Sequence, residues 1–270
     1  MIEKPKYRSK LRLRLGAYYY GMKRKLVWIQ NRRIFATNRN CENLSYRCFS
    51  HQTPLIRHLK NADMWMQENK VNNLRLAAEN IDGLILRPGE VFSYWRLIGK
   101  PSRSKGYREG MFLVNGTVQS GVGGGLCQLS NLIFWMTLHT PLTVVERHRH
   151  GYDVFPDSNR TQPFGSGATC FYPYIDLMIR NDTTDTYQLR IHVGEGNLEG
   201  EWRVDALPLN RFEIVERNHE MKGEIWGGFT RHNELYQQKY DLSGQLLSEH
   251  LVIQNSAIMM YTPFLEETEK

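Results

Sequence analysis

Residues 121–130 read Gly-Val-Gly-Gly-Gly-Leu-Cys-Gln-Leu-Ser, and this stretch indicates both a local fold and a chemistry. Glycines permit left-handed backbone conformations, and apolar residues continue through 132–138. We expect a turn that delivers Cys127 to the first turn of a helix. Unpaired N–H groups and positive potential at a helix N-terminus favour a thiolate, so a low pKa and a nucleophilic role are expected. The alternative is a buried, structural cysteine.

The same turn suggests where a substrate would lie. Glycines allow another molecule to approach the backbone closely. We therefore expect Gly123, Gly124 and Gly125, together with Gln128, to contact the substrate, and backbone donors there to stabilise a developing oxyanion.

A histidine to accept the thiol proton follows in the sequence. Val144 and Val145 indicate a strand, and alternation along it places Glu146, His148 and His150 on one face. Either histidine has a reference pKa suited to proton exchange near neutrality. A zinc site is the weaker alternative, since neither C-x-x-C nor H-E-x-x-H spacing is found. No metal or other cofactor is expected.

The surrounding segments predict an α+β fold. Apolar spacing predicts a helix over residues 55–81, and Asn115-Gly116 predicts a hairpin whose second strand leads into the glycine turn. Later strands are expected at 168–179, 187–193 and 201–204, and further strands follow from residue 211. We predict an antiparallel sheet with the cysteine helix packed on it.

At these residues the chain resembles the VanW family. The resemblance runs from about Asn72 to about Asp182, and four motifs carry it in order: LRPGEVFS at 86–93, GGGLCQLS at 123–130, ERHRH at 146–150, and YIDL at 174–177 leading to Arg180-Asn181. The family is named after a gene of vancomycin-resistance clusters, and some cell-wall proteins with this domain are L,D-transpeptidases that use a cysteine. The resemblance thus implies acyl transfer on peptidoglycan stem peptides.

The resemblance also assigns site residues. Cys127 matches the family cysteine and His150 the motif histidine, which leaves His148 as an additional histidine near the substrate. A third group should orient the catalytic histidine; Asp176, on an expected strand, is preferred over Asp153. Two other functions stay open: a non-catalytic binder of wall precursors or wall enzymes, and a cysteine peptidase or amidase.

Charge divides the chain unequally. Residues 1–60 contain fifteen Lys or Arg and two Asp or Glu, a balance of +13, whereas the remainder carries −6, in agreement with the net charge of +7. Within the basic part, six apolar residues recur at helical spacing: Leu11, Leu15, Tyr18, Met22, Leu26 and Ile29. This pattern predicts a basic amphipathic helix at an anionic membrane surface. The alternatives are a helix docked on its own domain through the apolar stripe and, less favoured, a nucleic-acid contact without a recognised binding module.

Length and composition favour one domain over two. We expect a basic, partly helical extension over residues 1–54 and an α+β domain over 55–270, with its motif core at about 72–182 and a β-rich part at about 183–270. No signal peptide or membrane-spanning segment is recognised, and the four cysteines show no disulfide spacing. A location in the cytoplasm, or at the cytoplasmic face of the membrane, is expected.

Overall fold

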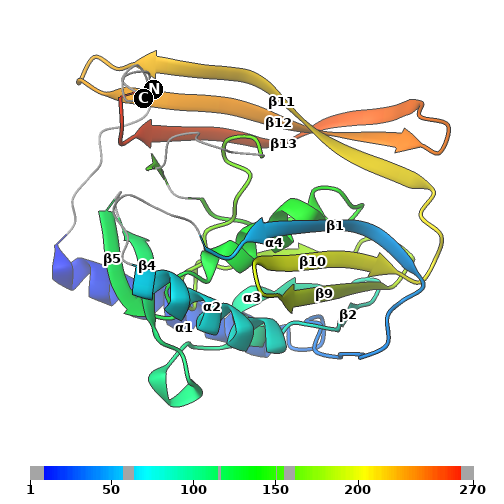
Figure 1. Ribbon diagram of the computed structural model, residues 1–270, viewed down its shortest axis with the longest axis horizontal. Coiled ribbons are helices and arrows are strands. Elements are labelled where there is room, and N and C mark those ends of the chain that lie inside the picture. The colour runs from blue at the N-terminus through cyan, green and yellow to red at the C-terminus, as the bar shows by residue number, and fades with distance from the viewer. Residues whose placement is uncertain (1–8, 57–63, 115–116, 150, 155–161, 263–270) are drawn as a thin grey trace.

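Four antiparallel strands form the central sheet of the computed structural model, which describes residues 9–56, 64–114, 117–149, 151–154 and 162–262 (Figure 1). In spatial order these strands are β1 (Tyr46–Pro54), β10 (Asn197–Val204), β9 (Tyr187–Val193) and β2 (Leu84–Leu86). Alternate residues of β10 are buried, among them Leu198 and Trp202. Gly200 lies between them, where a Cβ would come within 2.7 Å of Met136 Cε. The small residue therefore lets the helix α4 (Cys127–Thr137) pack closely on the sheet.

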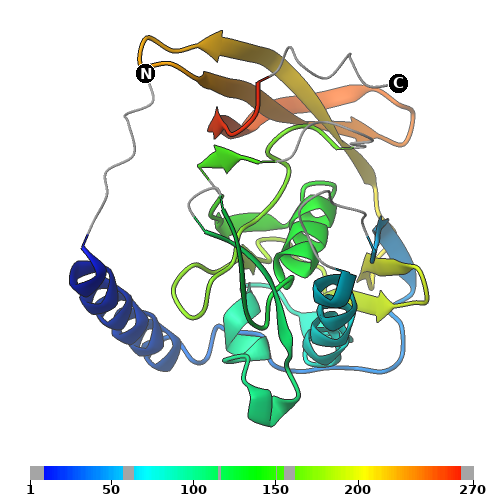
Figure 2. The same cartoon turned by 60° about the vertical axis from the view of Figure 1, so that its left-hand side comes forward.

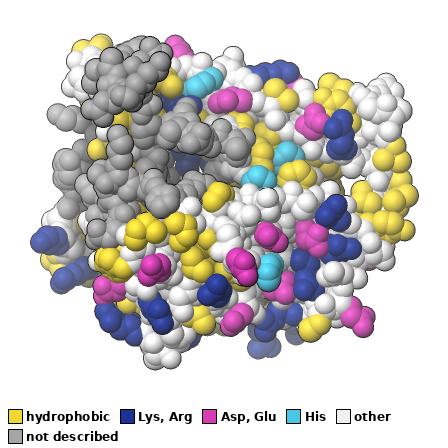
Figure 3. Space-filling view, viewed as in Figure 1, with side chains coloured by type: hydrophobic (Ala, Val, Ile, Leu, Met, Phe, Trp, Pro, Cys, Tyr) yellow, Lys and Arg dark blue, Asp and Glu magenta, His cyan; other side chains and the backbone are white. Residues whose placement is uncertain are grey.

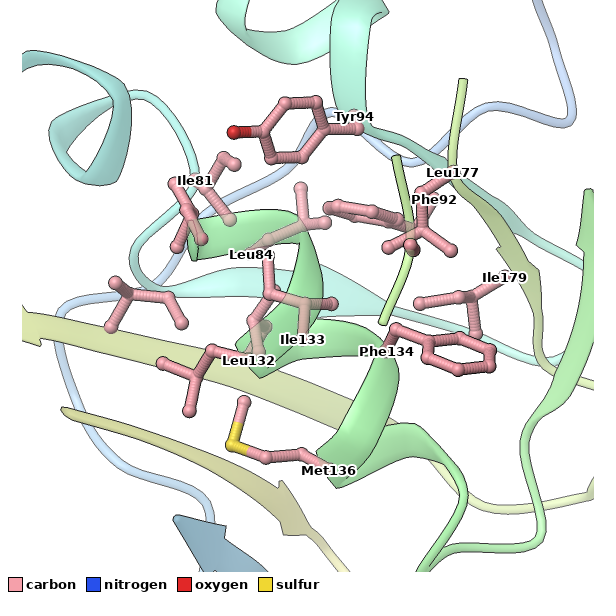
Figure 4. Close-up of a cluster of buried hydrophobic side chains, with 14 of the residues drawn as sticks. Ile81, Leu84, Phe92, Tyr94, Leu132, Ile133, Phe134, Met136, Leu177 and Ile179 are labelled. Atoms are coloured by element: carbon pink, nitrogen blue, oxygen red, sulfur yellow. The ribbon is translucent and has the colours of Figure 1, made fainter. Parts of the chain in front are cut away.

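The core is centred on α4. Eight residues of this eleven-residue helix are buried, so it is apolar on most sides rather than along a single stripe. Figure 4 shows Ile133 and Phe134 of α4 among Phe92, Leu177 and Ile179, which come from segments far apart in the sequence. Burying each such side chain contributes about 1.5–3 kcal/mol. This packing fixes the position of the helix that begins at Cys127.

Two smaller sheets flank this core. One has the order β3 (Val91–Ser93), β8 (Met178–Arg180), β6 (Thr143–Glu146), and the other is a hairpin of β4 (Glu109–Val114) and β5 (Thr117–Val122). Val114 pairs with Thr117, so the two strands are joined where the sequence predicts the turn, although Asn115 and Gly116 themselves lie outside the described residues. β5 leads directly into the glycine turn.

A long sheet covers the end of the core that lies at the top of Figure 1. It consists of β11 (Asn210–Gly223), β12 (Phe229–Asp241) and β13 (Leu246–Met259), with the short β7 (Tyr152–Asp153) pairing parallel to β13. Gln237 of β12 donates from Nε2 to the Leu138 carbonyl at 2.6 Å, and His139 Nδ1 lies 3.0 Å from the Phe212 carbonyl. These hydrogen bonds attach the long sheet to the C-terminal end of α4. The α+β class with mostly antiparallel sheets is confirmed.

Two predicted elements differ from the structure. The helix expected over residues 55–81 is α2 (Met64–Glu79), and Leu55 instead directly follows β1 as a buried residue. The strand expected over 168–179 is limited to β8, because residues 171–175 form a turn closed by reciprocal hydrogen bonds between Phe171 and Ile175. Pro173 within that turn has no N–H to donate to a strand partner. The short helices α3 (Tyr94–Ile98) and η1 (Arg103–Lys105) lie between β3 and β4 in the sequence.

The N-terminal helix α1 (Lys10–Gln30) lies at the edge of the molecule (Figure 2). Its two buried residues are Gly21 and Trp28, whereas all six residues of the predicted apolar stripe are exposed. Docking on its own domain through that stripe is therefore wrong. Further along the predicted extension, Phe35 is buried and β1 belongs to the central sheet.

Candidate active site

The glycine turn is packed tightly against the protein itself. Gly123 and Gly125 have φ of 83° and 90°, values that favour glycine. A Cβ on Gly124 would lie 2.0 Å from the Gly110 carbonyl carbon, and one on Gly125 would lie 2.2 Å from Lys70 Cγ. These glycines therefore allow close backbone packing, and contact of Gly123, Gly124 and Gly125 with a substrate stays a prediction.

The backbone N–H groups of the turn also hold it against the rest of the protein. Gly123 donates to the Arg108 carbonyl and Gly125 to the Met111 carbonyl, both at 2.9 Å. The turn is thus held against β4 and the residues before it. It presents Cys127 rigidly, at the first residue of α4.

Cys127 is half-buried, and its Sγ donates a hydrogen bond to the Cys170 carbonyl at 3.6 Å. Burial raises the pKa of the Cys127 thiol, and a hydrogen bond with the Cys170 backbone lowers it by less. The low pKa expected from the sequence is therefore wrong. A helix N-terminus favours the thiolate by only about 0.3–1 kcal/mol, whereas desolvation of the thiolate is the largest effect on this thiol and acts in the opposite direction.

Residues 168–170 connect the cysteine to the histidine segment. On one side, Ser130 Oγ donates to the Ala168 carbonyl at 2.7 Å, and Cys127 contacts Cys170 as described above. On the other side, the Thr169 N–H donates to the His148 carbonyl at 2.8 Å. Burial raises the pKa of Cys170 well above its ordinary value, so this second cysteine is a neutral thiol. Cys127 and His148 are therefore attached to the same short backbone segment.

His148 is paired with a carboxylate. Its Nε2 lies 3.0 Å from Glu146 Oε1, which also accepts the Asp176 N–H at 3.3 Å. Arg24 of α1 donates to the two Glu146 carboxylate oxygens at 2.5 and 2.7 Å. Burial raises the pKa of Glu146, but the hydrogen bonds from His148 and Arg24 outweigh it, and the pKa is lowered. Glu146 is thus an anion that holds both His148 and the N-terminal helix.

Asp176 contacts the start of α3, and its expected role of orienting His150 stays a prediction because His150 lies outside the described residues. It precedes β8, is fully buried, and accepts hydrogen bonds from Ser93 Oγ at 2.6 Å, the Trp95 N–H at 3.0 Å and the Leu177 N–H at 2.9 Å. Desolvation raises the pKa of its carboxyl to about 6. Its oxygens therefore hold the start of α3, and the carboxylate that holds His148 is Glu146. The sequence contained this signal, since Glu146 and His148 are separated by one residue.

The remaining predicted residues are placed as follows. Gln128 donates from Nε2 to Thr53 Oγ1 at 2.9 Å and to the Pro54 carbonyl at 2.8 Å, so it ties α4 to β1. Asp153, the second candidate for orienting a histidine, lies 3.4 Å from Arg231 in a buried ion pair. His150 lies outside the described residues, and its catalytic role stays a prediction.

Within the ranges that the structure describes, no group of three or more His, Cys, Asp or Glu side chains is arranged to hold a metal ion. The described site offers a thiol and a carboxylate-held imidazole, linked through the backbone of residues 168–170.

Known proteins have sequences similar to the part of this chain that contains the site. A family model described as "VanW like protein" matches residues 69–203. Vancomycin B-type resistance protein VanW of Enterococcus faecalis (strain ATCC 700802 / V583) is 35% identical over 221 residues, which cover 82% of this chain and 80% of that protein. Uncharacterized protein YoaR of Bacillus subtilis (strain 168) is 34% identical over 87 residues, 32% of this chain and 29% of that protein. No solved structure matches the chain significantly.

Proposed function

This chain belongs to the VanW family, as its four motifs predicted, and from that premise we propose that it catalyses cysteine-dependent acyl transfer on peptidoglycan stem peptides. One observation carries the proposal. Cys127 and the Glu146-held His148 are attached to opposite sides of residues 168–170. The name of the Enterococcus faecalis relative connects the proposal to vancomycin resistance.

In the proposed reaction, Cys127 Sγ attacks the carbonyl carbon of a stem-peptide amide, and the thiol proton passes to an imidazole. The carbon–nitrogen bond then breaks, and the imidazolium returns the proton to the leaving amine. The amine of a second stem attacks the thioester, forms a new amide and restores the thiol. Water in place of that amine would give a carboxypeptidase.

Two histidines and one backbone N–H take part in this reaction. The family resemblance assigns the proton transfer to His150. The described pair of Glu146 and His148 provides a second imidazole, held by a carboxylate in the way that a catalytic triad holds its base. We propose that the N–H of Cys127 donates a hydrogen bond to the oxyanion that forms on the attacked carbonyl, because the first N–H groups of a helix have no partner within the helix.

The raised pKa of Cys127 determines when the nucleophile forms. Without substrate the thiol is neutral, so the proton must be removed by a base during the attack rather than beforehand. The same neutral, partly buried thiol favours a second candidate function, a non-catalytic binder of wall precursors. The two functions differ in whether the peptide is changed.

Mass spectrometry of defined stem peptides distinguishes them. The full chain is incubated with a donor stem and an acceptor stem, alongside Cys127→Ser and the matched variant Cys41→Ser, whose cysteine is exposed. We expect a cross-linked or shortened stem from the wild type and Cys41→Ser, and none from Cys127→Ser. Equal product from Cys127→Ser would refute the nucleophile, and binding of the stem without product would establish the binder instead.

A further inference from the structure

The outward side of α1 is an apolar stripe without a protein partner in the described structure. Its members are exposed by 44% to 72%: Leu11, Leu15, Tyr18, Met22, Leu26 and Ile29. At 3.6 residues per turn they fall within an arc of about 80°. Monomeric proteins rarely leave such a continuous row of large apolar side chains in water, so this stripe requires an occupant.

The opposite side of α1 already binds the domain. Gly21 is buried against Pro173, which an added Cβ would approach to 3.4 Å, and Arg24 donates to Glu146 and, at 3.1 Å, to the Tyr174 carbonyl. The Trp28 carbonyl lies 3.4 Å from Arg96 Nη1, which donates to it. The domain thus holds the helix in an orientation that turns the stripe away from the core.

Charge identifies the occupant. Arg12 and Lys23 lie along one border of the stripe, and Arg14 and Lys25 lie along the other, all four exposed. The helix contains no Asp or Glu. Figure 3 shows basic side chains beside hydrophobic ones at the left edge of the molecule, where α1 begins. An apolar stripe bordered on both sides by cations complements a surface that is apolar inside and anionic outside.

We propose that α1 lies flat on the surface of an anionic phospholipid bilayer, with the apolar stripe in the boundary between headgroups and acyl chains. None of the helices in the described ranges is long and apolar enough to cross a membrane. Because Arg24 joins the domain side of the same helix to Glu146, the bilayer would lie about one helix diameter, roughly 10–12 Å, from that carboxylate. The proposal does not depend on acyl transfer.

Vesicle co-sedimentation of the full chain tests this proposal. Vesicles of phosphatidylcholine alone are compared with vesicles that also contain phosphatidylglycerol. Binding to the anionic vesicles should fall steeply as salt rises from about 0.05 to about 0.5 M, since the Debye length shortens. Lys25→Gln should weaken that binding about fivefold, because a cation near such a surface contributes about 1 kcal/mol.

A matched pair of variants locates the contact. Leu15 and Leu13 are both exposed leucines of α1, but Leu13 lies outside the stripe. The double variant Leu15→Gln/Leu26→Gln should lose at least about tenfold in binding, because two buried leucines are removed from the interface. Leu13→Gln should change binding less than about twofold, as expected for a side chain that stays in water.

Three results would overturn the proposal. They are absence of binding to anionic vesicles, equal losses in Leu13→Gln and the double variant, and self-association of the chain that the double variant abolishes without any binding to vesicles. The last result would assign the stripe to a second copy of this protein.

Discussion

Replacing Asp176 by Asn tests whether this carboxyl is a structural acceptor. The residue is fully buried, and its oxygens accept hydrogen bonds from Ser93, Trp95 and Leu177. An Asn oxygen can accept the two backbone N–H groups, and its amide can donate to Ser93 Oγ, so the variant preserves these contacts. It removes the charge that burial disfavours.

The size of the expected change in stability follows from the pKa of Asp176. Burial raises the pKa of Asp176 from 3.8 to about 6, so the folded protein binds more protons than the unfolded chain between those values. Stability therefore falls as pH rises through this range. A gap of about two pKa units corresponds to about 3 kcal/mol, which the wild type loses between about pH 4 and about pH 7 and the Asn variant does not.

Chemical denaturation of both proteins across this pH range measures the effect. The stability of Asp176→Asn relative to wild type should increase by about 3 kcal/mol as pH rises. Asp182→Asn is the control, because Arg180 lowers the pKa of that exposed carboxyl, so its contribution to stability is lost as pH falls. Parallel stability curves for wild type and Asp176→Asn would refute the raised pKa and the structural role derived from it.

Three further predictions concern the site. Without substrate, Cys41 should be alkylated faster than Cys127 at neutral pH, because burial raises the pKa of Cys127; faster modification of Cys127 in peptide mapping would contradict this. Gly124→Ala should lower the free energy of unfolding by at least about 2 kcal/mol, whereas Gly196→Ala, which has open space at its Cβ, should leave denaturation curves unchanged. Glu146→Gln should reduce turnover about 10- to 100-fold through loss of the charge that holds His148, and full turnover with intact folding would remove Glu146 from the mechanism.

Local patterns predicted much of this fold. Local sequence indicated β9 at 187–193 and the second half of β10 at 201–204, and Asn115-Gly116 indicated the junction of β4 and β5. Such features depend on neighbours in the sequence, so they are readable without tertiary structure. The helix expected from residue 55 was wrong because Leu55 follows a strand whose partner, β10, lies far along the chain.

The side-chain contacts and pKa values of the site were harder to predict from the sequence. Arg24 and Glu146 are 122 residues apart, and Ser93 and Asp176 are 83 apart, so their pairing depends on how the elements pack. The pKa of Cys127 was predicted in the wrong direction because helix position is local, whereas desolvation depends on the whole fold. Glu146 was recognised on the same face as His148, but its role required the structure.

Trapping of an acyl-enzyme would show whether Cys127 is the nucleophile of an acyl transfer. The full chain is mixed with a donor stem peptide without an acceptor amine, quenched in acid and analysed by intact mass and peptide mapping. We expect a thioester adduct on the peptide that contains Cys127, released by hydroxylamine and absent from Cys127→Ser. Product formation by wild type and Cys127→Ser alike, or an adduct on Cys41 or Cys48 in place of Cys127, would contradict it.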